Sequence, residues 1–444
     1  MKRIFLFSLF LLFTVCSNIE AVNRSDKQRI IVTTDLGGSD PDDIQSFIHL
    51  LLCSDIIDIE GVISSQTWID LPDNSALIKH YIDEYDNVLK NLSVHSNGYP
   101  TADYLKSVTC YGQSKCHMDG VGEGKDSDGS ELIIQAVDKK SDKRPVWVVA
   151  WGGTNCIAQA LWKVKNTRSE KELNEFISKI RIYDILGQDD AGAWIAKTFP
   201  DLFYIRNAKV YGWGPSAEWT DKNVQSIKPL GNAYPDSKWA TEGDSPSFFY
   251  LLANGLNVPE HVDYGGWGGR FDTKKQSGIR GMSFVERSGK SEKIYDDYYM
   301  YGCSPEGANA INRWKEHIYN NLAARMIWSS TNNYNDANHH PIAMIGKDNS
   351  LQCIYKKVAA GSEISFDASN SKDPDNDQLT FNWYIYKEAS SYKEPVDIKY
   401  NDKSKCTIYI PKDAGNHNIH LILEVTDSGS PALTSYRRIV LETK

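Results

Sequence analysis

Four aspartates lie close together in a short segment near the start of the chain, where they could bind a metal ion. The segment runs from Thr34 to Asp43 and contains Asp35, Asp40, Asp42 and Asp43. Carboxylates crowded around one helix start repel each other, and a hard divalent cation, which prefers oxygen ligands, would relieve that repulsion. We therefore interpret the segment as a metal site.

Helix capping is a simpler explanation for three of these acids. Asp40 would cap the helix, Pro41 would occupy its first position, and Asp42 and Asp43 would interact favourably with the helix dipole. Capping does not explain Asp35, which ends an apolar strand and is directed at the same place across a Gly-Gly turn. We prefer the metal site, and an acidic helix start without a metal is the alternative.

The elements around this segment alternate between strands and helices. A β-branched run at 29–34 precedes a helical pattern at 42–52. Further strands are expected at 56–64, 145–150 and 180–185, and further helices at 74–89, 131–138 and 155–164. This order predicts an α/β fold, a mostly parallel sheet flanked by helices. Sites in such sheets lie beyond the carboxyl ends of the strands, so chemistry is expected after Thr34, Ala150 and Ile185.

The C-terminal part of the chain has a different pattern. Runs of alternating polar and apolar residues at 363–367, 379–385, 406–410, 419–425 and 436–441 predict an all-β sandwich of about 100 residues. The segment from Phe366 to Asp377, followed by Phe381-Asn382-Trp383, resembles PKD and cadherin-like immunoglobulin-type modules. We predict one domain at 28–330, a polar linker at 331–342 and the immunoglobulin-like sandwich at 343–444.

The N-terminus has the pattern of an export signal. Lys2 and Arg3 precede an apolar run from Ile4 to Val15, which is too short to span a membrane. We predict a signal peptide at 1–21 and no transmembrane helix. Lipid attachment at Cys16 is the competing interpretation, so the protein is expected in the periplasm, secreted, or lipid-anchored at the cell surface.

Composition narrows the function classes. The formal net charge of −9 argues against electrostatic binding of nucleic acid. The eight cysteines show no zinc-binding spacing, whereas disulfides between Cys110 and Cys116 and between Cys353 and Cys406 are plausible in an exported chain. Of the 50 aromatic residues 36 are Tyr or Trp, a bias that suits sugar stacking, although core packing explains most aromatic residues.

The acidic segment resembles the start of the inosine-uridine nucleoside hydrolases. That family has a strand, an Asp, a Gly-containing turn and an Asp-Asp pair at a helix start. Trp151-Gly152-Gly153-Thr154-Asn155 and Glu242-Gly243-Asp244-Ser245-Pro246 resemble two further loops of the family. The resemblance implies a calcium ion (Ca2+) held by five residues: Asp35, Asp42, Asp43, Asp244 and the backbone carbonyl of Thr154. The turn is about three residues longer than in the family, which leaves open which of its acids bind the metal.

A closer resemblance is to an exported bacterial subgroup that joins a nucleoside-hydrolase-like domain to an immunoglobulin-like domain and is sometimes described as cellulose-binding. Three segments carry it: Gln188 to Ile195, Glu242 to Phe248, and Tyr264-Gly265-Gly266-Trp267-Gly268-Gly269-Arg270. As substrate contacts we expect Asp42, Asn155, Gln188, Asp189 and Arg270, with Trp151, Trp213 and Trp267 as stacking faces. Asp189 could instead cap the helix that follows it, and any one of the tryptophans could belong to the core.

These residues allow hydrolysis of a glycosidic bond. The resemblance implies that Asp35 is the general base that activates a water on the metal, and that the substrate carries a cis-diol sugar such as a riboside. Many nucleoside hydrolases have a His before the last metal-binding Asp, and here that residue is Gly243. Glu242 could act as the acid instead, or it could be an exposed, solvated side chain.

The sequence therefore predicts an exported, calcium-dependent hydrolase of an N-ribosyl or related glycosidic bond. A carbohydrate-binding protein that keeps the fold and metal without catalysis is the alternative. The expected partner is a carbohydrate or a nucleoside-like small molecule, with no nucleic acid, and the chain could form oligomers.

Overall fold

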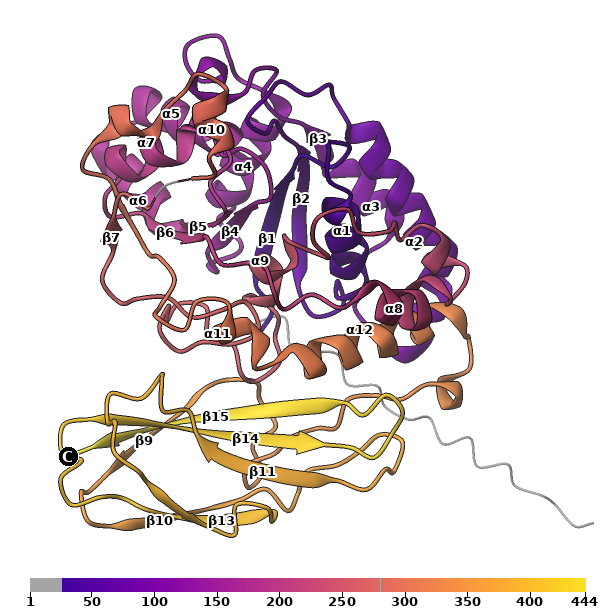
Figure 1. Cartoon of the computed structure of the whole chain (residues 1–444), viewed down its shortest axis with the longest axis vertical. Coiled ribbons are helices and arrows are strands. Elements are labelled where there is room, and N and C mark those ends of the chain that lie inside the picture. Colours follow the sequence, from indigo (N-terminus) through magenta and orange to yellow (C-terminus); the bar gives the residue numbers. More distant parts are fainter. Residues whose placement is uncertain (1–25, 280) are drawn as a thin grey trace, which may run out of the picture.

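A six-stranded, fully parallel sheet organises the N-terminal part of the chain (Figure 1). The computed structural model describes residues 26–279 and 281–444, so the predicted signal peptide lies outside the described residues. The strand order is β3-β2-β1-β4-β5-β6. The order reverses between β1 (Arg29–Thr34) and β4 (Val146–Ala150), and at such a point the loops that leave the two strands diverge and open a place for a ligand.

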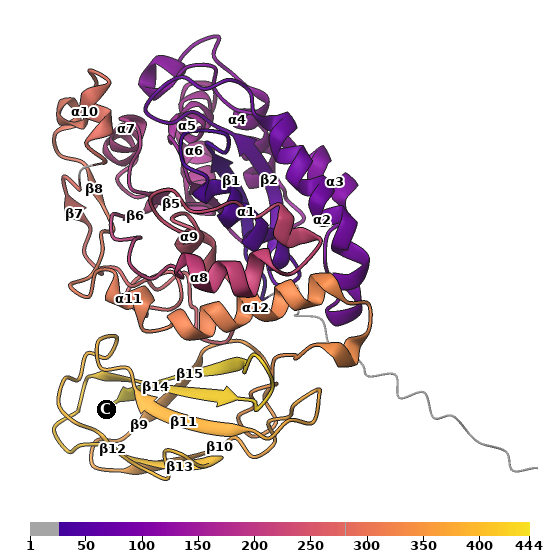
Figure 2. The ribbon, with the colours of Figure 1, turned by 45° about the vertical axis from the view of Figure 1, so that its right-hand side comes forward.

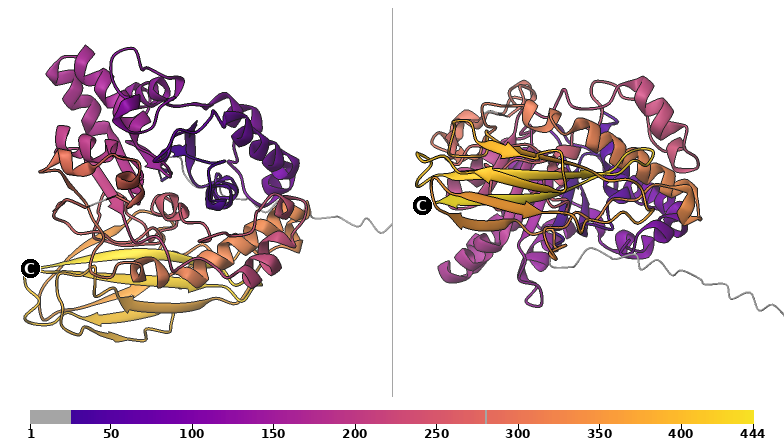
Figure 3. Two further views of the ribbon diagram at one scale, coloured as in Figure 1. Left: turned by 45° about the horizontal axis from the view of Figure 1, so that its top comes forward. Right: turned by 90° about the horizontal axis from the view of Figure 1, so that it is seen from below.

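The strands are apolar because both faces of the sheet are covered. All six residues of β1 are buried: Ile30 and Val32 pack on one side, and Ile31 packs on the other. The first side is covered by α1, α2 and α12, and the second by α4, α5 and α7, an arrangement that Figure 3 shows. The predicted α/β class is confirmed.

The other strands of this part and its helices have the following bounds. The strands are β2 (Asp58–Ser64), β3 (Thr109–Tyr111), β5 (Ile180–Ile185), β6 (Phe203–Asn207), β7 (Gln276–Ser277) and β8 (Tyr299–Met300). The helices are α1 (Asp42–Leu52), α2 (Ser75–His95), α3 (Ala102–Ser107), α4 (Asp128–Asp138), α5 (Asn155–Thr167), α6 (Glu170–Lys179), α7 (Ala191–Thr198), α8 (Ala217–Thr220), α9 (Ser245–Phe249), α10 (Phe284–Arg287), α11 (Asn309–Asn312) and α12 (Lys315–Ser330).

The C-terminal part is a β-sandwich, as the alternating pattern predicts. One sheet has the order β11-β14-β15-β9, and the other has the order β10-β13-β12. The strands are β9 (Ile354–Val358), β10 (Glu363–Asp367), β11 (Thr380–Ile385), β12 (Asp397–Lys399), β13 (Lys405–Tyr409), β14 (Asn418–Thr426) and β15 (Thr434–Thr443). Trp383, Leu421, Leu423 and Ile439 fill the space between the sheets.

The strands β14 and β15 are buried on both faces, because the outer face of their sheet packs against the α/β part (Figure 2). Ile422 and Tyr436 belong to the same apolar cluster as β1. The Trp267 indole N–H donates to the Tyr436 hydroxyl at 3.2 Å, and the Arg438 guanidinium donates to the backbone carbonyls of Leu256 and Gly265. The Tyr264–Arg270 motif therefore builds the contact between the two parts of the chain.

The segment predicted as a polar linker is packed. It contains a short 3-10 turn at Tyr334–Asp336, after which Asn338 and His339 are buried. The Asn338 amide donates to Asp427 at 3.0 Å, and the backbone N–H of His339 donates to Asp375 at 2.8 Å. These bonds fix the connection to the sandwich.

Two further expectations concern cysteines and membrane helices. All seven cysteines in the described residues are free, so neither the Cys110–Cys116 nor the Cys353–Cys406 disulfide is present. No helix within residues 26–279 and 281–444 is long and apolar enough to cross a membrane.

The shared apolar cluster predicts that the two parts unfold together. Tyr436→Ala should lower the free energy of unfolding by about 3 kcal/mol or more, because it removes a buried aromatic ring from the contact. Thermal unfolding by calorimetry measures this, with Tyr400→Ala as the control because Tyr400 is 65% exposed. Two separate transitions, of which only one shifts, would contradict a single cooperative unit.

Candidate metal and substrate site

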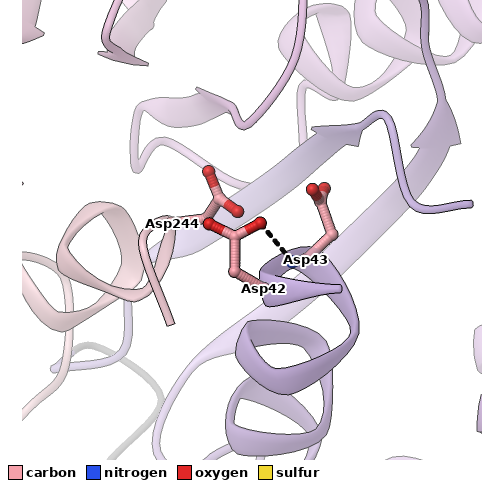
Figure 4. Close-up of side chains that lie close together, drawn as sticks. All are labelled: Asp42, Asp43 and Asp244. Atoms are coloured by element: carbon pink, nitrogen blue, oxygen red, sulfur yellow. Dashed lines mark hydrogen bonds between the residues drawn. The ribbon is translucent and has the colours of Figure 1, made fainter. Parts of the chain in front are cut away.

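Three carboxylates from two distant segments converge at the carboxyl end of β1 (Figure 4). Asp42 and Asp43 lie in the first turn of α1, and Asp244 immediately precedes α9. One oxygen of each lies within 4.8 Å of an oxygen of the other two. Asp35 follows β1 directly, and its charge acts on Asp43 and Asp244.

The cluster is electrostatically unfavourable when all four acids are ionised. Each side chain is at least nine-tenths buried. Burial, and then the charge of Asp42, raises the pKa of Asp35 to about 7. Burial, and then Asp43, raises the pKa of Asp42 to about 8, and the pKa values of Asp43 and Asp244 are also raised by burial and by neighbouring carboxylates.

Two oxygens of the cluster have no hydrogen-bond donor in the described part of the chain. These are Oδ1 of Asp35 and Oδ2 of Asp244, both buried. By contrast, Asp43 accepts a hydrogen bond from the Thr34 hydroxyl, and Oδ1 of Asp42 accepts one from the backbone N–H of Asp43 at 3.1 Å. Buried acceptors without donors, surrounded by like charges, fit a hard divalent cation with oxygen ligands.

Helix-end interactions account for only some of these acids. Asp42 and Asp43 lie in the first turn of α1, where they interact favourably with the helix dipole, but Pro41, not Asp40, occupies the cap position. Asp40 lies at the edge of the cluster: burial raises its pKa, and a hydrogen bond from the backbone N–H of Asp42 and then the charge of Lys238 oppose that effect. The turn before the helix depends on Gly37, whose φ of 93° favours glycine.

Glu242 is neither an exposed, solvated side chain nor a free acid, because it is fully buried and its carboxylate is fully hydrogen-bonded. Its carboxylate accepts hydrogen bonds from Tyr234 and Ser245, each at 2.8 Å, and pairs with the His49 Nδ1 at 2.7 Å. Burial lowers the pKa of His49, but the Glu242 carboxylate and Cys53 together outweigh burial and raise it to about 9. Glu242 therefore anchors the turn that carries Asp244, and its carboxylate does not reach a leaving group.

The loops after β4 and β5 are hydrogen-bonded to each other. Asp189 accepts hydrogen bonds from the Thr154 hydroxyl at 2.7 Å and from the Asn155 N–H at 3.0 Å. It also accepts a hydrogen bond from the N–H of Ala191, the first residue of α7, at 3.1 Å, although the cap residue of that helix is Asp190. The Gln188 amide donates to the Trp151 carbonyl and accepts from Thr67 at 2.8 Å. Asp189 and Gln188 thus position the loops.

The backbone of these loops comes very close to the carboxylates. A Cβ on Gly152 would lie 2.9 Å from Oδ1 of Asp35, and one on Gly243 would lie 2.5 Å from Oδ2 of Asp42. A side chain at 243 would thus displace Asp42, so no His fits there. The Thr154 carbonyl accepts the first hydrogen bond of α5, from Ala158 at 2.9 Å.

Comparison with known proteins agrees with this arrangement. Residues 29–271 match the family described as "Cellulose-binding Sde182, nucleoside hydrolase-like domain", and residues 363–443 match "Cellulose-binding protein Sde0182, C-terminal domain". The chain belongs to this family. A nucleoside hydrolase-related hypothetical protein from Saccharophagus degradans, described as associated with carbohydrate metabolism, is 46% identical, with a TM-score of 0.90 over 94% of this chain and 100% of that one.

Two further solved structures match only a small share of the chain. A PKD domain is 14% identical over 20% of this chain and 82% of that chain, with a TM-score of 0.16. Repeats of human CDH23 are 17% identical over 20% of this chain and 30% of that chain, with a TM-score of 0.16. Both are too slight to support a conclusion. No curated protein matches the chain.

Three tryptophans expected as stacking faces are core residues in this Sde182-family protein. Trp151, Trp213 and Trp267 are at most 3% exposed. The Trp151 indole N–H donates to Ser247 in α9 at 2.7 Å, so it braces the helix that follows Asp244. Arg270, also expected as a substrate contact, instead pairs with Glu306.

Two exposed aromatic side chains at the site were missed from the sequence. Tyr211 is 47% exposed, and the charges of Asp42 and Asp244 act on it. Trp239 is 66% exposed, beside Lys238. Sequence periodicity does not show which of two aromatic residues in a loop is buried, so the sequence predicts Trp213, and not Tyr211, as the stacking face.

The raised pKa values predict how stability depends on pH without metal. The folded carboxyls bind protons more tightly than the unfolded ones, with a usual pKa of 3.8. Their contribution to stability is therefore fully present below that value and is lost as the pH rises through about 7 to 8. In chelator, the free energy of unfolding should decrease between pH 5.5 and 8.5 by roughly 1 kcal/mol per pH unit for each proton released. The melting temperature should fall over the same range.

Asp42→Asn provides the matched control, because it removes one titrating group and relieves Asp35. Calorimetry of this variant in chelator should show a shallower pH dependence than the parent protein. An identical slope in the two proteins would mean that the cluster does not cause the effect.

Proposed function

We propose that the protein is a calcium-dependent hydrolase that cleaves a glycosidic bond of a carbohydrate. The observation that carries the proposal is the buried carboxylate cluster at the strand-order reversal, with its two oxygens that lack donors. The family description supports a carbohydrate as the ligand, and the N-terminal apolar run supports export to the periplasm, the cell surface or the medium.

Asp42, Asp43, Asp244 and Asp35 would hold the cation, together with the Thr154 carbonyl. A bound divalent cation supplies Lewis-acid chemistry, because it lowers the pKa of water and binds sugar hydroxyls. Asp35 is the residue best suited to take a proton from the attacking water, since its Oδ1 has no donor and lies against the open backbone of Gly152.

Cleavage also requires a proton on the leaving group. Gly243 offers no side chain for this step, and Glu242 is committed to His49, Tyr234 and Ser245. This observation favours a second candidate function, a carbohydrate-binding protein that keeps the site without turnover. A screen of cello-oligosaccharides, aryl ribosides and nucleosides for released reducing sugar distinguishes the two functions.

Asp35→Asn should lower turnover by about a hundredfold or more, because the amide cannot act as a base. Rates of reducing-sugar release measure this, and calcium binding is followed in the same samples so that loss of metal is recognised. Asp40→Asn is the matched control from the same turn and should retain most of the activity. Full turnover by Asp35→Asn would refute the proposed base.

Calcium titration tests the metal directly. Asp244→Asn should weaken calcium binding at least tenfold in calorimetry, because it replaces a buried carboxylate of the cluster with a neutral amide. Asp377→Asn controls for the acids of the sandwich, where Asp377 is partly buried beside Asp373 and Asp375. If the unmodified protein shows neither heat of binding nor a higher melting temperature in calcium, the site holds no calcium.

A further inference from the structure

Two of the most exposed aromatic side chains of the described chain lie beside the carboxylate cluster. Tyr211 follows β6 by four residues, and Trp239 lies five residues before Asp244. A contiguous apolar surface marks a binding site, whereas single exposed apolar side chains are normal. The two rings therefore support a binding site only through their arrangement around the cluster.

Tyr211 occupies the space next to the residue that lacks a side chain. Its ring lies 3.5 Å from the position that a Cβ of Gly243 would take, and the same position is 2.5 Å from Oδ2 of Asp42. The Tyr211 ring is therefore the side chain that borders the cluster on this side. Burial, and then the charges of Asp42 and Asp244, raises its pKa, so it is a neutral phenol at physiological pH.

Trp239 is held near the other end of the acidic turn. The Lys238 ammonium lies 4.2 Å from the centre of the Trp239 ring and donates to the Ser39 carbonyl at 3.0 Å. Its charge also acts on Asp40. The indole thus stands beside the turn that joins Asp35 to Asp42.

The loops that carry the two rings are bonded to each other. The Thr241 hydroxyl donates to the Pro215 carbonyl at 3.1 Å and lies 2.7 Å from the Ser237 hydroxyl. Gln45 of α1 donates to the Pro235 carbonyl at 2.9 Å. The loops that carry the two rings are therefore connected to each other and to the helix that carries Asp42. Little ordering of these loops is needed on binding.

We propose that Tyr211 and Trp239 form the subsite for the leaving group and stack on the sugar ring next to the scissile bond. This assignment rests on the proposed glycosidic function. Aromatic faces pack against the apolar C–H face of a sugar ring, while the Tyr211 hydroxyl offers a polar edge for its hydroxyls. The cellulose-binding description of the family favours a sugar over a nucleobase.

Affinity for cellohexaose, measured by calorimetry in calcium, tests the subsite. The Asp35→Asn background prevents turnover during the titration. Trp239→Ala and Tyr211→Ala should each raise Kd about tenfold, whereas Tyr211→Phe should keep most of the affinity because the ring remains. Tyr400→Ala is the matched control, because Tyr400 is exposed to the same extent as Trp239 but lies in the sandwich. Melting temperatures confirm that each variant is folded.

Several results would overturn the assignment. Unchanged affinity in Trp239→Ala and Tyr211→Ala removes the subsite, and so does the absence of cellohexaose binding by the parent protein. If only Tyr400→Ala loses affinity, the binding site lies on the sandwich. If the variants weaken inosine binding and leave cellohexaose binding intact, the subsite takes a nucleobase and the sugar assignment is wrong.

The same measurements separate this inference from the proposed function. If Trp239→Ala weakens binding and the parent protein cleaves no glycoside, the two rings bind a sugar, and both the hydrolase proposal and the leaving-group role of the rings fail. If Asp35→Asn abolishes cleavage and neither aromatic variant affects affinity, the hydrolase stands and the subsite fails.

Discussion

Repulsion among four buried carboxylates is the constraint on which the α/β part of this protein depends. Burial alone raises the free energy of an ionised carboxylate, and each neighbour of like charge raises it further. Folding nevertheless brings Asp35, Asp42 and Asp43 to one end of β1 and places Asp244 against them. Protonation relieves this repulsion, as the raised pKa values of Asp35 and Asp42 show, and the proposed divalent cation would relieve it as well.

The surroundings of the cluster hold these charges in place. Glu242 has a φ of 51°, a conformation that is unfavourable for any residue except glycine, and four hydrogen-bonding partners stabilise it there. His49 carries the compensating positive charge, since its pKa is raised to about 9. Because both side chains are fully buried, the pair fixes the turn before Asp244 relative to α1.

The sequence predicts the elements of the fold and site that a local residue pattern determines. The strand and helix around Asp35 and Asp42 follow from periodicity, and the resemblance pointed to Asp244 200 residues away. The sequence does not show in the same way which of these side chains are buried. Glu242 reads as a surface acid and Trp213 as a sugar contact because their partners, among them His49 and Phe249, come from remote segments. Short strands such as β3 and β6 were missed, since three to five residues give little periodicity.

The β-sandwich is connected to the site through aromatic packing. Tyr436 contacts Trp267 with ring centres 6.2 Å apart, and Trp267 contacts Phe249 of α9 at 6.4 Å. Phe249 and Phe248 in turn enclose His49, at 5.0 and 5.6 Å. The helix that begins after Asp244 is thus packed between the His49–Glu242 pair and the sandwich. Since close-packed interiors transmit small shifts, the outer face of the C-terminal sheet helps to determine where Asp244 lies.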